Sequence, residues 1–249
     1  MMIFLSIINH NHDKMLASNP YLAEIAKKYN VLIKSNTPVT EELLLFSQRN
    51  NITLIDKKYG RGFSENNNIV FDYLSKNNII NDDDFFLVIN PDVLIDISQL
   101  IQLEKETHKV KSDIYTINLF KDSDLSIHEY SIKRFPRLTG PLQGLFLKEK
   151  RTDSYDKENI CEPIEVDWAA GSFLMFKKKC YDELKGFNQK FFMYFEDVDV
   201  CRRAQKKGMV LTYLPNIKAI HKGAFNNRNI FSKHFIWYLR SYLRYHFNF

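Results

Sequence analysis

Three carboxylates follow an aromatic run in the last third of the chain, where Glu196, Asp197 and Asp199 come directly after residues 191–195. Large apolar side chains favour burial, whereas ionised carboxylates are buried only when they are paired or hydrogen-bonded. The segment is therefore expected to leave the core and enter a lined pocket. A carboxylate in such a pocket can act as a general base.

A structural role explains the same residues. The positive end of a helix stabilises each acidic residue in its first turn by about 0.3 to 1 kcal/mol. Lys206, Lys207 and Gly208 supply the basic last turn and the glycine that commonly end a helix. Taken alone, the segment fits a well-capped helix better than an active site. The motifs elsewhere in the chain decide between the structural and the catalytic interpretation.

Asp92 is a candidate ligand for a metal ion. It follows the apolar residues 85–89 through Asn90 and Pro91, and open α/β sheets bind ligands at the carboxyl ends of their strands. A carboxylate at this edge can hold a divalent cation against a diphosphate. The acidic run at 82–84 is most simply a solvated turn.

Two further segments could approach a ligand closely. Gly60 and Gly62 precede a predicted helix that ends near Lys76, and glycines at a helix start let backbone amides approach a phosphate or a base. Gly171 stands in a run of small residues beside Trp168. An ordinary capped loop explains the first segment more readily, and a tight turn packed by an indole explains the second nearly as well.

The surrounding elements predict an α/β fold with a mostly parallel central sheet flanked by helices, in one Rossmann-like domain. Apolar runs alternate with amphipathic segments in a βαβαβ order. The expected strands are 3–8, 31–34, 52–55, 85–89, 114–120, 173–176 and 210–214, and the expected helices are 20–29, 40–48, one ending near 76, and 98–108. His221 is expected on a loop, where a lone histidine is more often a structural hydrogen-bonding group than a ligand.

The alternation of apolar and amphipathic segments stops at residues 121–165. This change predicts an insertion over the pocket mouth or a surface loop. The tail at 231–249 carries aromatic and leucine side chains near helical spacing, with Lys233, Arg240 and Arg244 among them. It predicts a basic amphipathic helix that either lies on an anionic membrane surface or packs on the domain. The expected division is a domain at 1–229 followed by this helix at 230–249.

Composition narrows the class of protein. The chain has 249 residues, 45% hydrophobic content and a net charge of +5, enough to bury a sizeable core. Its basic residues are spread along the sequence, which argues against a nucleic-acid-binding protein. Three cysteines without a CxxC pair indicate neither a disulfide framework nor a zinc site. We expect reduced thiols, no signal peptide and no membrane span.

In combination and order, these motifs resemble the inverting family 2 glycosyltransferases with the GT-A fold. The likeness rests on Asn90-Pro91-Asp92, on residues 166–172 and on the segment from Gly186 to Asp199. It is greatest to the rhamnosyltransferases that build bacterial O-antigen, lipopolysaccharide and related polysaccharides. It extends from the first strand to His221 and includes the aromatic tail.

The resemblance implies a role for each residue at a matching position. Asp197 would be the catalytic base, and Glu196 would support it or contact the acceptor. Asp92 would be the final acid of the metal-binding DxD motif, whose first acid is replaced by Asn90, and His221 would be a second ligand of Mg²⁺ or Mn²⁺. The residues expected to contact the donor or the acceptor are Asn9, Asn36, Gly62, Phe63, Asn67, Asn90, Trp168 and Gly171.

The implied reaction is transfer of L-rhamnose from dTDP-L-rhamnose to a polyprenyl-diphosphate-linked sugar such as N-acetylglucosamine. The implied place is the cytoplasm, peripheral to the inner face of the cytoplasmic membrane. The donor sugar rests on the resemblance alone, and a UDP-hexose or UDP-N-acetylhexosamine fits the same scaffold. Two rivals of other classes are a non-catalytic sugar-nucleotide-binding subunit of an assembly complex and a metal-dependent hydrolase of nucleotide sugars.

Overall fold

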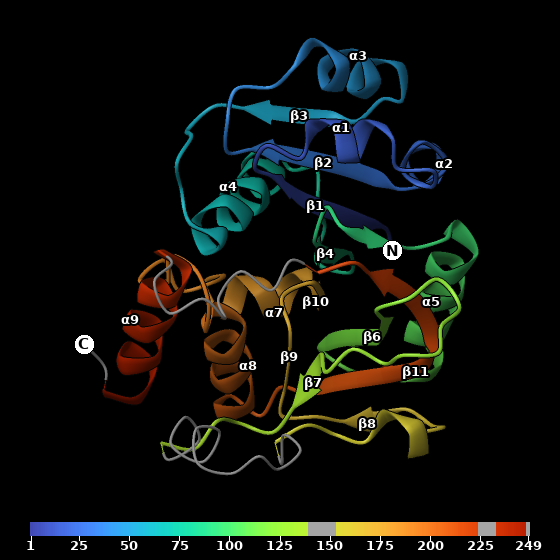
Figure 1. Ribbon diagram of the computed structural model, residues 1–249. Helices are drawn as coiled ribbons and strands as arrows, with labels where there is room; N and C mark the ends of the chain where they lie inside the picture. The colour runs from blue at the N-terminus through green and yellow to red at the C-terminus, as the bar shows by residue number, and fades with distance from the viewer. Residues whose placement is uncertain (139–152, 224–232, 248–249) are drawn as a thin grey trace.

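The computed structural model describes residues 1–138, 153–223 and 233–247. Their main feature is a curled nine-stranded sheet with the strand order β3-β2-β1-β4-β10-β6-β11-β5, in which β8 also pairs with β11 (Figure 1). Its strands are β1 (Ile3–Asn9), β2 (Asn30–Ser35), β3 (Thr53–Asp56), β4 (Phe85–Ile89), β5 (Val93–Leu94), β6 (Ile114–Phe120), β8 (Ile164–Glu165), β10 (Phe173–Lys177) and β11 (Leu211–His221).

A second, two-stranded sheet pairs β7 (Ile132–Lys133) with β9 (Trp168–Ala169). The helices are α1 (Asp13–Ala17), α2 (Leu22–Lys28), α3 (Glu41–Arg49), α4 (Phe63–Lys76), α5 (Ile97–Lys109), α7 (Lys178–Glu183), α8 (Glu196–Lys206) and α9 (Lys233–Phe247), with a 3-10 turn, η1, at Lys157–Asn159. None of the helices in the described ranges is long and apolar enough to cross a membrane.

The alternation of side chains along each strand builds two hydrophobic cores, one on each face of the large sheet. On β4, Phe85, Leu87 and Ile89 belong to the core that packs under α1, α2, α3 and α5. Phe86 and Val88 on the same strand belong to the core under α4, α7 and α8. The sheet is thus covered on both faces, as an α/β sequence with fully apolar strands predicts.

The first half of the sheet confirms the predicted parallel pairing, since β1 pairs in parallel with both β2 and β4, and β2 pairs in parallel with β3. The second half is mixed. Strand β10 lies antiparallel between β4 and β6, and β5 and β8 pair antiparallel with β11. The central sheet is therefore less uniformly parallel than the alternation of strands and helices predicts.

The predicted loop at His221 was wrong. His221 ends β11, a strand that begins at Leu211 and continues through Pro215, with a register shift between Leu214 and Lys218. A proline has no amide to donate to a sheet, but an irregularity in the pairing accommodates it. The continuous strand brings His221 opposite Val93 in β5.

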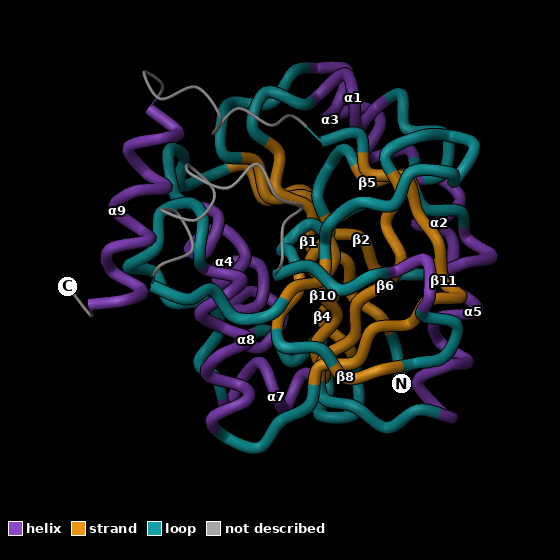
Figure 2. The backbone as a smooth tube through the Cα atoms, turned by 60° about the horizontal axis from the view of Figure 1, so that its bottom comes forward, coloured by secondary structure: helices purple, strands orange, loops and turns teal. Residues whose placement is uncertain are grey.

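Helix α9 confirms the predicted tail helix and lies at the side of the molecule away from α5, in both Figure 1 and Figure 2. It packs on the aromatic segment that precedes α8, where Phe191, Phe195, Val198 and Tyr242 form a third hydrophobic cluster. The predicted loop at 121–165 falls partly outside the described residues. Its described parts contain β7, η1 and β8.

Candidate active site

The candidate base lies at the start of α8. Asp197 accepts a backbone hydrogen bond from Gly171 at 3.1 Å through Oδ2, and one from Val198 at 2.9 Å through Oδ1. Asp197 keeps partial access to solvent, whereas its neighbour Glu196 is only 7% exposed. The two adjacent carboxylates therefore have unequal surroundings, which is how proteins assign different protonation states to a pair.

The pKa directions follow from these surroundings. Burial and the nearby charge of Asp197 raise the pKa of Glu196 well above its usual value. Burial also raises the pKa of Asp197, but the amides of Gly171 and Val198 and the charge of Lys133 oppose the rise. Glu196 Oε2 has no hydrogen-bonding partner among the described residues. Hydrogen bonds from two amides thus favour the ionised form of Asp197, whereas Oε2 of Glu196 has no such donor in the described part of the chain.

Gly171 lies between Asp197 and Phe63. A Cβ atom on Gly171 would come 3.3 Å from Phe63 Cε1 and 3.7 Å from Asp197 Cβ. Close by, Trp168 donates from Nε1 to the carbonyl of Arg134 at 2.8 Å, and the ammonium of Lys133 lies 5.0 Å from the centre of its ring. The small sheet of β7 and β9 therefore places an indole, a cation and a close backbone turn beside the carboxylate.

Gly62 fixes the aromatic segment to the start of α4. A Cβ atom there would lie 2.3 Å from the carbonyl oxygen of Phe192, and the next amide, that of Phe63, donates to the same oxygen at 2.9 Å. The glycine is required by this backbone contact. The first amide of α4 consequently binds a neighbouring loop, and the expected contact of this turn with a phosphate stays a prediction.

The three asparagines expected at the nucleoside all make internal hydrogen bonds. Asn36 exchanges two hydrogen bonds with the Arg61 backbone, at 2.8 and 2.9 Å. Asn9 is buried and bonds to Asp13, Ser35 and the amide of His12. Asn67 is buried between Ser6 and the carbonyl of Phe63. These side chains shape the ends of β1, β2 and α4, and their contact with a nucleoside remains a prediction.

Asp92, His221 and Glu129 form a connected row. His221 Nε2 lies 3.3 Å from Asp92 Oδ1, and Nδ1 lies 2.9 Å from Glu129 Oε2. Burial lowers the pKa of His221, but the hydrogen bonds to the two carboxylates outweigh it and raise the pKa to about 9. For Asp92 the effects have the opposite signs. Burial raises its pKa, but the hydrogen bond and the charge of His221 lower it, and the net pKa lies below the usual value. Asp92 Oδ2 also accepts from the amide of Gly223 at 3.1 Å.

Glu129 was not among the predicted site residues. It lies in the stretch interpreted as an insertion, 92 positions from His221, and no spacing rule links residues so far apart. The two metal-ligand candidates, by contrast, are brought together as the resemblance implied. No group of three or more His, Cys, Asp or Glu side chains within the described ranges is arranged to hold a metal ion by itself.

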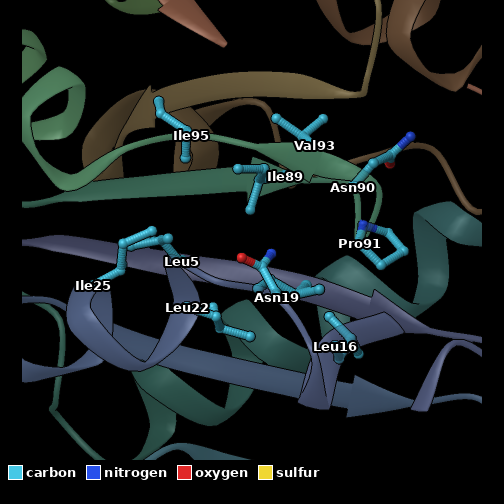
Figure 3. A pocket seen from close by; sticks show the side chains of 11 residues that line it. Leu5, Leu16, Asn19, Leu22, Ile25, Ile89, Asn90, Pro91, Val93 and Ile95 are labelled. Atoms are coloured by element: carbon cyan, nitrogen blue, oxygen red, sulfur yellow. The ribbon is translucent and has the colours of Figure 1, made fainter. Parts of the chain in front are cut away.

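A small apolar pocket lies on the other face of β4, against α1 and α2 (Figure 3). Asn90 and Pro91 reach it from the turn that leads to Asp92, and its other lining residues are apolar except Asn19. No charged side chain lines it, so it has no group to bind a diphosphate. The backbone of Asn90 fixes this turn, since its N–H donates to the carbonyl of Ser172 and its carbonyl accepts from the amide of Val93, and the predicted contact of Asn90 with the donor stays a prediction.

No family model matches the sequence. The chain is 33% identical over 249 residues to the rhamnosyltransferase WbbL of Escherichia coli, covering 98% of this chain and 92% of the relative. It is 29% identical over 149 residues to an N-acetylglucosaminyl-diphospho-decaprenol L-rhamnosyltransferase of Mycobacterium tuberculosis, covering 57% of this chain and 48% of the relative.

Among solved structures, the fold is similar to that of a mannosyltransferase from Pyrobaculum calidifontis in complex with GDP-Man and Mn²⁺. The TM-score is 0.58 at 12% identity, and the alignment covers 96% of this chain and 60% of that one. At this identity the likeness concerns the fold.

Proposed function

The chain belongs to the rhamnosyltransferases of the family 2 glycosyltransferases with the GT-A fold, and from this premise we propose that it transfers L-rhamnose from dTDP-L-rhamnose, with inversion, to a polyprenyl-diphosphate-linked N-acetylglucosamine. The observation that carries the proposal is the unequal pair at the start of α8, in which Asp197 is partly exposed and Glu196 is buried. The acceptor class is supported by the name of the mycobacterial relative.

In the proposed mechanism Asp197 removes the proton from the acceptor hydroxyl. The hydroxyl oxygen forms a bond to the anomeric carbon of rhamnose while the bond to the diphosphate breaks on the opposite face. The dTDP leaves with the electron pair of that bond, and Asp197 ends protonated. A positioned base contributes about 10²- to 10⁴-fold to such a step. The Gly171 amide keeps Asp197 in place by its 3.1 Å hydrogen bond.

Asp92 and His221 are the residues proposed to hold a divalent metal, Mg²⁺ or Mn²⁺. Asp92 Oδ1 and His221 Nε2 lie 3.3 Å apart as an ion pair, and both would become ligands if a metal ion displaced the proton on Nε2. Two protein ligands leave the remaining positions to water and the donor diphosphate, which suits Mg²⁺. The metal would stabilise the negative charge of the departing diphosphate.

Glu129 extends this proposed metal site. A histidine that binds a metal through Nε2 commonly donates its Nδ1 hydrogen to a carboxylate, which fixes the tautomer and the orientation of the ring. Glu129 stands at that position, 2.9 Å from Nδ1 of His221. We therefore assign Glu129 as the residue that orients His221 toward the metal.

Helix α9 supports the proposed contact with the inner face of the cytoplasmic membrane. Its outer face exposes four large apolar residues, Ile236, Leu239, Leu243 and Phe247. Lys233, Arg240 and Arg244 lie along the same helix, and such a combination binds anionic lipid surfaces. Phe195, two residues before the candidate base, packs on the inner face of this helix, so membrane contact through the outer face would place the lipid-linked acceptor on the same side of the molecule as Asp197.

A product assay tests the function. Purified protein is incubated with dTDP-L-rhamnose, Mg²⁺ or Mn²⁺, and a lipid-linked N-acetylglucosamine diphosphate, beside UDP-sugars and a reaction without acceptor. Release of dTDP that depends on acceptor is expected. Transfer from a UDP-sugar but not from dTDP-L-rhamnose would show that the proposed donor is wrong. Release of free sugar without acceptor would indicate a hydrolase. No turnover with any donor would favour a non-catalytic subunit.

A further inference from the structure

Two consecutive residues before the candidate base adopt an unfavourable backbone conformation. Tyr194 and Phe195 have φ angles of 69° and 66°. This left-handed region is suited to glycine, and other residues populate it at a cost of about 1 to 3 kcal/mol each. Such a conformation persists only where the surrounding structure holds it. Glu196 and Asp197 follow directly, so whatever holds this turn also sets the start of α8.

Helix α9 supplies the contacts on one side of the turn. The rings of Tyr238, Tyr242 and Tyr245 surround Phe195, with ring centres 5.5, 5.8 and 5.5 Å away. Spacings of four and three residues place these tyrosines on one face of the helix. Phe195 is only 7% exposed as a result. Its side chain cannot swing out of this ring cluster without exposing apolar surface.

Two hydrogen bonds from α9 reach the turn as well. Ser241 Oγ donates to the carbonyl of Met193 at 2.9 Å, and the Tyr194 hydroxyl lies 3.0 Å from Nδ1 of His234. On the other side, Phe192 accepts the amide of Phe63 at the start of α4. The aromatic turn is therefore held between the N-terminus of α4 and the tyrosine face of α9.

The backbone conformation of Phe195 sets the orientation of α8, the helix that carries the candidate base. Phe195 is the N-cap of α8, and its carbonyl accepts the amide of Asp199 at 2.8 Å. A change at Phe195 would rotate the first turn of α8 and move Asp197 from the Gly171 amide. A displacement of about 1 Å at a reacting group can lower a rate by 10²-fold.

We propose that α9 is a positioning element of the active site, in which Tyr238, Tyr242 and Tyr245 act through Phe195 to hold Asp197 where it accepts the acceptor proton. The inference rests on the proposed role of Asp197 as the base. It gives α9 a second task besides membrane contact, and the two tasks belong to opposite faces of one helix.

The double variant Tyr242→Ala with Tyr245→Ala tests the proposal, in detergent solution with a short-chain acceptor so that vesicle binding plays no part. We expect kcat to fall by about 10²-fold while the dissociation constant for dTDP stays within about twofold, since donor binding does not depend on the base. The paired variant Tyr242→Phe with Tyr245→Phe keeps the rings and should retain activity. The control Leu239→Ala with Leu243→Ala changes the outer face of the same helix.

A rescue separates positioning from simple loss of stability. Adding Tyr194→Gly to the double variant should recover part of kcat, because glycine adopts the left-handed conformation without strain. Because relief of this strain also stabilises the fold, kcat is compared at a temperature where every variant is fully folded, so that a recovered kcat reports the position of the base. If the double alanine variant does not fold, Tyr245→Leu with and without Tyr194→Gly gives the same comparison.

The hydrogen-exchange rate of the Gly171 amide reports whether its hydrogen bond to Asp197 is intact, and this measurement needs no turnover. Exchange should become about 10-fold faster in the double alanine variant, as its hydrogen bond to Asp197 loosens, and remain unchanged in the outer-face control. Unchanged exchange together with unchanged kcat would overturn the proposal. A wild-type protein without transferase activity would overturn the function instead, because the exchange measurement stands apart from it.

Discussion

The backbone amide of Gly171 donates to Oδ2 of Asp197 at 3.1 Å, across 26 positions of sequence. This hydrogen bond joins the turn between β9 and β10 to the first turn of α8. It favours the ionised form of Asp197, while the adjacent Glu196 has no such donor on Oε2 among the described residues. The relationship gives the two carboxyl groups different chemistry.

Replacing the base should stop turnover and spare binding. Asp197→Asn keeps the shape of the side chain and removes its ability to accept a proton, so we expect kcat to fall by about 10²- to 10⁴-fold. The dissociation constant for dTDP, measured by calorimetry, should change little. Asp199→Asn is the matched control, because Asp199 pairs with Arg203 at 2.7 Å. Normal kcat in Asp197→Asn would move the base elsewhere.

Removing the charge of Glu129 should weaken metal binding. Glu129→Gln is expected to lower the affinity for Mn²⁺ in the presence of dTDP by about 10- to 100-fold, because the loss of a residue that orients a metal-binding histidine typically costs this much. Titration calorimetry measures the affinity directly. Glu162→Gln, at an exposed position, is the control. An equal Mn²⁺ affinity in both variants would exclude the assigned role.

Buried Lys157 should make stability depend on pH. Burial lowers its pKa to about 7 against the partial opposition of Glu129, and its amine bonds to Ser131 at 2.7 Å. Between the folded pKa and the ordinary value of 10.5, the unfolded chain binds the extra proton, so the cost of burying this lysine falls and the stability of the fold rises with pH.

The free energy of unfolding, measured in urea, tests this sign. The difference between wild type and Lys157→Met should be nearly constant below pH 7 and should grow in favour of wild type between pH 7 and 10. The slope is at most about 1.4 kcal/mol per pH unit. The contributions of groups far from Lys157 cancel in this comparison, whereas His221, which contacts Glu129, has a raised pKa that acts in the opposite direction. A difference that does not change with pH would show that Lys157 titrates normally.

Charging the outer face of α9 should release the protein from anionic membranes. Leu239→Glu with Leu243→Glu places like charges against phosphatidylglycerol vesicles, and we expect binding in a sedimentation assay to fall by at least about 10-fold. Leu44→Glu with Leu45→Glu makes the same change at two exposed leucines of α3. Equal loss in both variants would mean that the contact is nonspecific. Turnover of a short-chain acceptor should persist.

Local patterns were sufficient for most of the fold. The apolar run at 85–89 and the strand at 114–120 have the predicted bounds, and Thr40, where the helix at 40–48 was predicted to start, caps α3 by accepting the amide of Leu43. These features depend on neighbours within a few residues. Helix α1 was not predicted, because its five residues are too few to show a helical period.

The site was less predictable because its partners come from distant positions. Side-chain amides bind a nucleoside or a backbone equally well, and only the folded chain shows that Asn36 meets Arg61. The predicted strand ends at Leu214, before Pro215, whereas β11 continues to His221. The contacts of α9 with Phe195 join residues more than 40 positions apart, so helical spacing predicted the helix but not its neighbour.

Strand β10 is the sole bridge between the two halves of the large sheet in the part of the chain that the structure describes, since it pairs with both β4 and β6. During synthesis β1 to β4 can pair once Ile89 has left the ribosome, whereas β6 must wait for residues 173–177. The protein should therefore assemble in two stages, with the amino-terminal half forming first and β10 closing the sheet. The candidate base follows β10 along the chain, so during synthesis it leaves the ribosome after the strand that closes the sheet.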